Sequence, residues 1–228
     1  MGLKTLFGLK RRLTELPRLD LAALPAMLGR SDPTILEIGA NDGWDSRRFV
    51  DLFPSARLYC FEPDARAISD WRSRMGGTSA TLIEAAVGAK SGVTTFHVSS
   101  GRKVPGRKQE WHKSGSIHRP TGHLKAHPWV RFEETATVQI ISLDEWSKAN
   151  EIGPVDFIWA DVQGAERDLI YGARDVLRRT RYFYTEYSDV ELYASQPTLA
   201  EIEDQPPGFR LLTRYPKDAL FINGCMMT

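Results

Sequence analysis

The feature that most constrains this chain is a strand, a turn and a helix in close succession around residue 40. The apolar run Ile35–Ile38 predicts a buried strand, and the turn Gly39-Ala-Asn-Asp-Gly43 separates it from a helix that starts near Trp44. Glycines allow a sharp turn and a close approach to bare backbone, while a helix start presents unpaired N–H groups. We therefore expect the first strand of an α/β sheet, with a ligand bound at the turn.

This turn is close to the dinucleotide-binding pattern G-x-G-x-x-G but departs from it. That pattern would need glycines at the positions of Asn41 and Trp44. The close pyrophosphate approach of NAD proteins is therefore not encoded, and an NAD oxidoreductase is the least favoured function. A nucleoside ligand without a pyrophosphate fits the turn better.

Strands and helices alternate along most of the chain. Further strands are predicted at Arg57–Phe61, Thr81–Ala85, Val155–Trp159 and Tyr182–Tyr184, and helices at Asp45–Leu52, Asp64–Met75 and Glu166–Leu177. Near the end, Phe209–Thr213 and Leu220–Ile222 predict an antiparallel hairpin. Continuous apolar strands that alternate with helices predict a doubly wound, mostly parallel sheet covered on both faces. Ligands of such sheets bind at the carboxyl ends of the strands.

Composition excludes several classes of protein. The net charge is +1, with 42% hydrophobic and 26% charged residues, which is ordinary for a globular protein and gives no general argument for nucleic acid. Two cysteines, Cys60 and Cys225, exclude a disulfide-rich scaffold. No apolar run reaches the roughly 18 residues of a membrane span. We therefore expect a cytoplasmic enzyme or binding domain.

The first 30 residues differ from the rest of the chain. Leucines separated by lysines and arginines predict an amphipathic helical segment over residues 1–30, broken near Pro17 and followed by one domain over residues 31–228. Such a segment can act as a lid or lie on a membrane surface. Packing on the domain or on a second subunit of a homodimer is the favoured interpretation.

A polar insertion interrupts the alternation. Between predicted strands Val93–Val98 and Thr137–Ile141, residues 99–136 predict a long loop with Trp111 and Trp129, which is unusual in a compact domain. Its basic side chains and histidines are Arg102, Lys103, Arg107, Lys108, Lys113, Arg119, Lys125, Arg131, His112, His118, His123 and His127. The loop is either a substrate lid or a solvated surface, and its histidine spacing matches no compact zinc pattern.

Acidic residues follow several of the predicted strands. Glu62, at the end of the second strand, suits a grip on ribose hydroxyls, and the small residues after Glu84 could border an adenine ring. Asp161 and Glu186 follow adjacent strands, so we expect them to lie side by side. Such a pair can divide acid and base roles or hold a divalent cation. Glu166 is explained equally well by the favourable field at a helix start.

Taken in order, these blocks resemble the FkbM-type methyltransferases. The resemblance rests on Ile35–Gly43, Phe61-Glu-Pro63, Ala86-Val-Gly88, Ile141-Ser-Leu-Asp-Glu-Trp146 and Val155–Glu166. It implies the class I methyltransferase fold, a Rossmann-like sheet of seven strands whose last strand is antiparallel. It also implies S-adenosylmethionine as methyl donor and O-methylation of a hydroxyl on a sugar, glycan or natural product.

The resemblance also assigns roles to individual residues. The donor would be bound by Glu37, Gly39, Ala40, Asn41, Gly43, Glu62, Pro63, Glu84, Ala86, Val87, Asp161 and Gln163. We expect Asp161, directly or through a divalent cation shared with Glu186, to accept the proton of the acceptor hydroxyl, with His118 as the rival base. The sequence leaves open whether such a cation is used. Two alternatives stay open, an RNA methyltransferase whose loop tryptophans stack on bases and a non-catalytic donor-binding partner subunit.

Overall fold

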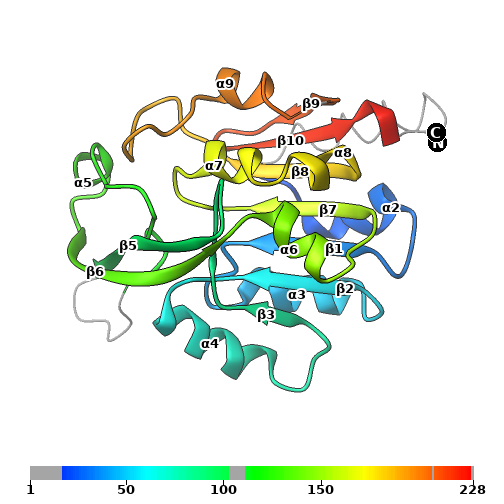
Figure 1. Cartoon of the computed structure of the whole chain (residues 1–228), viewed down its shortest axis with the longest axis horizontal. Coiled ribbons are helices and arrows are strands. Elements are labelled where there is room, and N and C mark those ends of the chain that lie inside the picture. Colours follow the sequence, from blue (N-terminus) through cyan, green and yellow to red (C-terminus); the bar gives the residue numbers. More distant parts are fainter. Residues whose placement is uncertain (1–16, 103–110, 207, 227–228) are drawn as a thin grey trace.

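A seven-stranded sheet forms the centre of the protein. The computed structural model describes residues 17–102, 111–206 and 208–226, and within these the strand order is β3-β2-β1-β7-β8-β10-β9 (Figure 1). The strands are β1 (Thr34–Ile38), β2 (Arg57–Phe61), β3 (Thr81–Ile83), β7 (Val155–Ala160), β8 (Thr180–Glu186), β9 (Phe209–Arg214) and β10 (Asp218–Asn223). Strand order reverses between β1 and β7, which is where ligands bind in sheets of this kind.

Strand direction confirms the predicted topology. Neighbours β3, β2, β1, β7 and β8 run parallel, whereas β10 is antiparallel to both β8 and β9. The predicted C-terminal hairpin is therefore correct. Ile38 and Ala160 are partners at the ends of β1 and β7, so the turn that begins at Gly39 lies beside Asp161.

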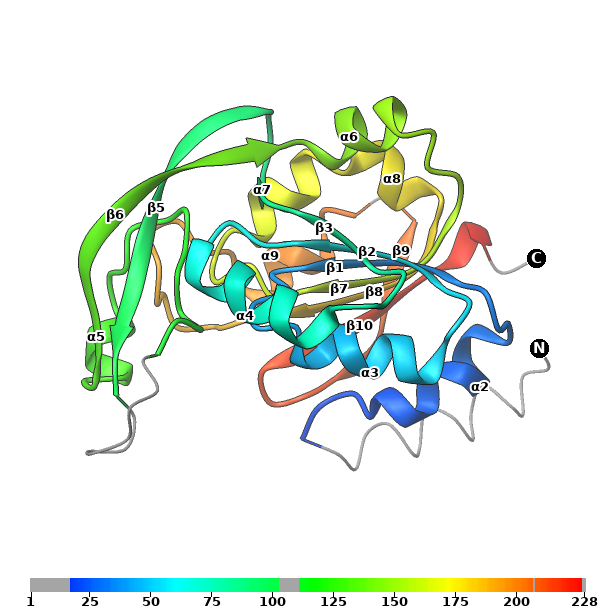
Figure 2. The same cartoon turned by 90° about the horizontal axis from the view of Figure 1, so that it is seen from below.

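The two faces of the sheet bury separate apolar clusters, as the alternation of side chains along a strand requires. In β1, Ile35 contributes to one cluster and Leu36 to the other. The first face is covered by α2 (Leu24–Leu28), α3 (Trp44–Leu52) and α4 (Ala65–Met75). The second is covered by α6 (Leu143–Ala149), α7 (Glu166–Tyr171), α8 (Arg174–Arg178) and α9 (Leu199–Glu203), and Figure 2 shows the sheet edge-on between these layers.

The end of the N-terminal segment packs on the domain. Leu19, Leu21 of the 3₁₀ helix η1 (Leu21–Ala23), and Leu24 are almost fully buried in the same cluster as Phe49 and Trp71. The apolar side chains of residues 17–30 thus pack into the core of the domain, while most of the other side chains of this segment are exposed. The amphipathic pattern predicted before them falls on residues 1–16, which lie outside the described residues.

The structure has two short helices where the sequence predicts one. The sequence predicts a single helix over Glu166–Leu177, but α7 ends at Tyr171 and α8 begins at Arg174. Gly172 lies between them with no room for a side chain, because a Cβ there would collide with the carbonyl of Gly88. The side chain of Asp144 accepts the N–H groups of Asp175 and Val176 at 2.9–3.1 Å and so caps α8. Within the Ser-Leu-Asp block, Asp144 therefore holds the start of α8 in place.

The insertion lies at the end of a long β-hairpin, whose strands extend into the loop predicted over residues 99–136. The strands take up residues 99–101 and 130–136, and most of the described residues between them form a loop, as predicted. Strands β5 (Gly92–Gly101) and β6 (Val130–Ile141) pair antiparallel, and β4 (Ala86–Val87) joins β6 to make a second sheet. The helix α5 (His123–Ala126) lies near the far end of the hairpin, which arches away from the main sheet (Figure 2). The sequence did not predict a strand over Arg131–Ala136 because most of its side chains are polar. Both faces of this two-stranded ribbon accept polar side chains.

Replacing Gly39 by alanine should destabilise the fold by several kcal/mol. Gly39 has φ +86°, and a Cβ there would collide with the backbone carbonyl of Asp161. The matched control is Gly77→Ala, because Gly77 has φ +81° and open space around it. The control should show only the cost of about 1–2 kcal/mol of a left-handed alanine. Urea unfolding of both variants measures the difference, and equal losses would contradict the packing argument.

Candidate active site

A cavity of about 430 Å³ opens at the carboxyl ends of β1 and β7, within the size range of small-molecule sites. We call it the donor cavity. The carboxyl ends of β1, β2, β7 and β8 and the first residue of β10 contribute to its wall, together with Ala85–Val87 and part of the hairpin. The strand-order reversal thus coincides with a cavity, as expected for this fold.

The turn after β1 is held to the end of β2 by a carboxylate. Asn41, at φ +46°, donates its backbone N–H to Glu62 Oε2 at 2.8 Å, and Asp64 donates its own to Glu62 Oε1 at 2.8 Å. Burial raises the pKa of Glu62 to about 7, although both hydrogen bonds favour the ionised form. Glu62 therefore closes the turn against β2 while still lining the donor cavity.

Glu37 is the centre of a buried hydrogen-bond chain behind the turn. Trp71 donates its indole N–H to Ser46 Oγ at 2.9 Å, and Ser46 donates its hydroxyl to Glu37 Oε2 at 2.5 Å. The thiol of Cys60 lies 3.3 Å from the same oxygen. Burial raises the pKa of Glu37 to about 8, so this carboxyl group is largely protonated near neutral pH.

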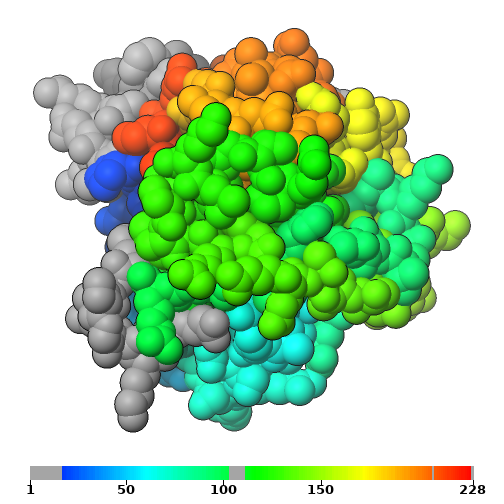
Figure 3. All heavy atoms as spheres, turned by 90° about the vertical axis from the view of Figure 1, so that its left-hand side faces the viewer, coloured from blue at the N-terminus to red at the C-terminus, as the bar shows by residue number. Residues whose placement is uncertain are grey.

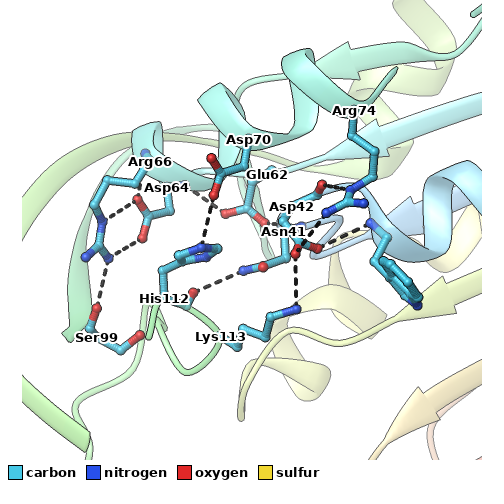
Figure 4. A network of polar contacts seen from close by, with 11 residues as sticks. Asn41, Asp42, Glu62, Asp64, Arg66, Asp70, Arg74, Ser99, His112 and Lys113 are labelled. Carbon is cyan, nitrogen blue, oxygen red and sulfur yellow. Dashed lines mark hydrogen bonds and ion pairs between the residues drawn. The ribbon is translucent and has the colours of Figure 1, made fainter. Parts of the chain in front are cut away.

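The hairpin is fastened to the donor cavity by a polar network (Figure 4). Asn41 donates its side-chain amide to the carbonyl of His112 at 3.0 Å, and His112 Nε2 lies 3.3 Å from Asp70 of α4. Lys113 Nζ lies 3.4 Å from Asp42 Oδ2, and Arg74 also reaches Asp42. His112 and Lys113, which follow β5 in the insertion, thus contact the glycine turn and α4.

Two carboxylates and an amide form the far wall of the donor cavity. Gln163, after β7, donates its side-chain amide to Asp161 Oδ1 at 2.6 Å and to Glu186 Oε2 at 2.7 Å. Removal from bulk water raises the pKa of Asp161, and the same effect plus the nearby Asp161 charge raises the pKa of Glu186 well above its usual range. Glu186 therefore holds the proton of this pair, and Asp161 is the group that ionises first.

A second cavity of about 650 Å³ adjoins the first. It lies under the end of the hairpin, and both cavities share Lys113, Asp161, Gln163, Glu186 and Lys217 as wall. Figure 3 shows the segments around residues 111–140 spread over this side of the molecule. The carboxylate pair thus stands between two cavities.

Most of the residues predicted from the sequence come together at the donor cavity. Those that line it are Glu37, Gly39, Ala40, Asn41, Glu62, Pro63, Ala86, Val87, Asp161, Gln163 and Glu186. The predicted neighbourhood of Asp161 and Glu186 is present, with Gln163 between them.

Three predicted site residues lie elsewhere. Glu84 is half exposed and forms an ion pair with Arg72 of α4, since its side chain leaves the short strand β3 on the solvent side. His118 Nε2 lies 2.7 Å from Asp168 of α7, outside the donor cavity. Gly43, at φ +74°, is the residue before α3, where a Cβ would collide with the ring of Trp71.

Several lining residues were not predicted. Trp44 has 57% of its surface exposed and carries the guanidinium of Arg74 at 5.2 Å from its ring centroid. Asp42 was within the predicted turn, and its charge was a usable signal. His112 and Lys113 belong to the insertion, and their place in the donor cavity depends on tertiary contacts that no local pattern encodes.

Three further features of the described residues bear on the expectations from the sequence. In the described part of the chain, no group of three or more His, Cys, Asp or Glu side chains is placed to hold a metal ion. Within residues 17–102, 111–206 and 208–226, no helix has the length and apolar character needed to cross a membrane. Cys60 and Cys225 are free thiols.

Comparisons with known proteins agree with this geometry. A family model described as the methyltransferase FkbM domain matches residues 37–210. The 2-O-methyltransferase NoeI of Sinorhizobium fredii (strain NBRC 101917 / NGR234) is 45% identical over 193 residues, which are 84% of this chain and 78% of that protein. The chain belongs to the FkbM methyltransferase family. It is an S-adenosylmethionine-dependent O-methyltransferase, so the family and the reaction predicted from the sequence are confirmed.

A solved structure supports the fold. The crystal structure of methyltransferase FkbM from Methylobacillus flagellatus KT matches with a TM-score of 0.52 at 13% identity, over 84% of this chain. This chain spans 44% of the length of that one. At this level of identity the match bears on the fold alone, which is the class I methyltransferase fold predicted from the sequence.

Glu62→Gln should weaken binding of S-adenosylmethionine at least tenfold. A glutamine offers one acceptor oxygen where Glu62 accepts two backbone N–H groups, so the turn at Asn41 loses a hydrogen bond as the ribose-facing charge disappears. Glu84→Gln is the matched control, because that carboxylate lies outside the donor cavity. Titration calorimetry with the donor compares both with wild type, and equal affinities would contradict the assignment.

Glu37→Gln should make stability less dependent on pH. The folded protein holds a proton on Glu37 up to a pKa of about 8, against 4.5 when unfolded, so stability falls as pH rises between these values. The full contribution of Glu37 is at most about 5 kcal/mol. Urea unfolding at pH 5 and pH 9 should show a smaller loss in the variant, while Glu84→Gln should keep the wild-type loss. An unchanged loss in Glu37→Gln would show that this group is ionised when folded.

Proposed function

We propose that the chain transfers the methyl group of S-adenosylmethionine to a secondary hydroxyl of a sugar or glycan, with Asp161 as the base. The observation that carries this proposal is the Asp161–Gln163–Glu186 arrangement between the donor cavity and the second cavity. The 2-O-methyltransferase relative suggests the 2-hydroxyl of the acceptor. An ionised carboxylate in this place has the chemistry needed to accept a hydroxyl proton.

The donor cavity fits S-adenosylmethionine. Glu62 at the end of β2 would hold the ribose hydroxyls, and the small residues Ala85 and Ala86 leave room beside the backbone for the adenine ring. Asn41 Oδ1 is buried and has no hydrogen-bond partner among the described residues, as expected of an atom that meets a ligand donor. The methionine portion would lie along Gly39–Asn41, toward Asp161.

The chain's own residues have three tasks in the reaction. S-adenosylmethionine supplies a methyl group that is already activated for transfer. Gly39 and the turn after it fix the position of the donor, and alignment of two reactants supplies a large part of the rate. Asp161 accepts the hydroxyl proton as the oxygen attacks. Gln163, which is hydrogen-bonded to both carboxylates, keeps the ionised Asp161 oriented beside protonated Glu186.

A divalent cation between the two carboxylates is not favoured. The amide of Gln163 points its donor group at both Asp161 and Glu186. A hydrogen-bond donor occupies the direction from which a cation would have to be bound, and the proton held by Glu186 further lowers the charge available to a metal. Full transfer activity in the presence of EDTA is expected.

A cytoplasmic location and a homodimer remain proposals. The free thiols of Cys60 and Cys225 are consistent with a reducing compartment. Leu19, Leu21 and Leu24 are buried within the domain, so a truncation that tests a dimer contact of the N-terminal segment has to stop before residue 17. Light scattering of the full chain and of this truncation measures the oligomeric state.

Asp161→Asn should lower the rate of methyl transfer about 10²–10⁴-fold, because asparagine cannot accept the proton. Donor affinity should stay within about threefold of wild type. His118→Asn is the matched control for the rival base and should retain most of the rate, since His118 faces Asp168. The assay follows labelled methyl transfer to a panel of sugars and glycans. An active Asp161→Asn variant with normal donor binding would refute the carboxylate mechanism.

The pH profile gives an independent check on the base. The pKa of Asp161 is raised by its removal from bulk water, so the rate should rise with pH along a limb that lies above the ordinary range of an aspartate. The Asp161→Asn variant should lose this limb. A wild-type limb that persists in the variant would assign the titration to another group.

A further inference from the structure

The second cavity has the position of an acceptor site. Its wall includes Asp161, Gln163 and Glu186, which also line the donor cavity, so molecules bound in the two cavities would meet at the proposed base. Methyl transfer needs the acceptor oxygen in line with the bond that breaks, which requires the two reactants on opposite sides of the reacting carbon. This arrangement rests on the proposed function.

Two buried polar groups in the second cavity have atoms without a partner. Glu166 is 1% exposed, and while its Oε1 accepts the N–H of Gly164 at 3.1 Å, Oε2 has no hydrogen-bond partner among the described residues. His123 is 2% exposed, and its Nδ1 likewise has no hydrogen-bond partner among the described residues. Leaving such buried atoms without a hydrogen bond is unfavourable. A ligand with hydroxyl groups would supply that hydrogen bond.

An aromatic corner forms another part of the wall. The rings of Trp111 and Trp129 meet edge to face with centroids 4.5 Å apart, and His127 lies against Trp129 at 5.9 Å. His123 packs against His127 and Tyr193. A flat apolar surface beside polar groups suits a pyranose ring, whose C–H face packs on an aromatic side chain while its hydroxyls face polar atoms.

The charges of the second cavity disfavour a polyanion. Its lining holds the cations of Lys113, Arg214 and Lys217 and the carboxyl groups of Asp161, Glu166, Glu186 and Asp189, of which Glu186 is protonated. Two of the three cations are already paired: Lys113 with Asp42, and Arg214, whose Nη2 lies 3.0 Å from Asp189 Oδ2. Binding of nucleic acid depends on a surplus of cations that meet phosphates, and this wall offers no such surplus among the residues described for it.

We infer that the second cavity is the acceptor subsite and that it binds an uncharged saccharide. Trp129 and Trp111 supply the surface on which a sugar ring packs, and Glu166 and His123 hydrogen-bond to its hydroxyls. These residues determine which acceptor is used, whereas Asp161 at the shared wall acts on the hydroxyl that reacts. Acceptor recognition therefore resides largely in the hairpin and in the segment after β7.

The experiment uses the full chain and a panel of neutral methyl pyranosides and short neutral oligosaccharides. Saturation-transfer NMR with S-adenosylhomocysteine bound measures saccharide binding. Transfer of a labelled methyl group from S-adenosylmethionine, measured separately without S-adenosylhomocysteine, gives kcat and KM. The variants are Trp129→Ala and Glu166→Gln. Their matched controls are Tyr171→Ala, an aromatic residue 45% exposed on α7, and Glu133→Gln, an exposed carboxylate on β6.

We expect both variants to raise the acceptor KM or Kd at least tenfold while donor affinity stays within twofold, and both controls to match wild type. The retained donor affinity shows that the variants are folded. Transfer to a saccharide with an unchanged KM in Trp129→Ala and Glu166→Gln would overturn the assignment of the cavity and leave the proposed function intact. Saccharide binding that these variants weaken, without any transfer, would support the subsite and count against the proposed reaction.

A second arm tests the chemical class. Short single-stranded RNA is titrated at 50 and 200 mM salt. We expect no specific binding of RNA and no competition with the saccharide. RNA binding that falls steeply with salt and is lost in Trp129→Ala, or failure of every neutral saccharide to bind, would overturn the inference.

Discussion

The rest of the site depends on the close approach of two backbones, where β1 and β7 end side by side. Asp161 donates its N–H to the carbonyl of Ile38 at 2.8 Å, and its own carbonyl occupies the space in which residue 39 would otherwise carry a Cβ. This contact places the glycine turn and the carboxylate of Asp161 at a fixed separation. In the proposed reaction, the turn positions the donor and Asp161 acts on the acceptor, so this separation sets the distance between the two reactants.

Buried acids stabilise this edge of the sheet in different protonation states. Glu37 is largely protonated and belongs to a hydrogen-bond chain behind the turn, whereas Glu62 is fixed by two backbone N–H groups, which favour its ionised form against the effect of burial. Of Asp161 and Glu186, Glu186 holds the proton. Four ionised carboxylates so close together would repel one another, and the protons held by Glu37 and Glu186 lessen that repulsion.

The sequence predicts the main sheet well because its information is local. Each feature that predicts it is encoded by a few neighbouring residues: continuous apolar strands, the Gly39–Gly43 turn and the acids at strand ends. The predicted positions of Glu62, Asp161 and Glu186 at strand ends around one cavity therefore agree with the structure. The errors share a cause, which is dependence on distant partners. Glu84 turns outward to Arg72, His118 turns to Asp168, and Gly172 ends a helix because it packs on Gly88. The strand over Val130–Ala136 was not predicted, because a solvent-exposed ribbon lacks the alternation of apolar and polar residues that indicates a strand.

The hairpin β5–β6 has a consequence for how such enzymes diversify. It pairs with β4 in a sheet of its own, so its strands share no hydrogen-bond ladder with the seven-stranded sheet. Lengthening or shortening its tip changes the walls around Trp129 and α5 without shifting the register of β1 against β7. Within this architecture the residues around the donor cavity can stay the same while the residues around the second cavity change. The exception is the short stretch from His112 to Lys113, which contacts the glycine turn and which a change at the hairpin tip has to leave in place.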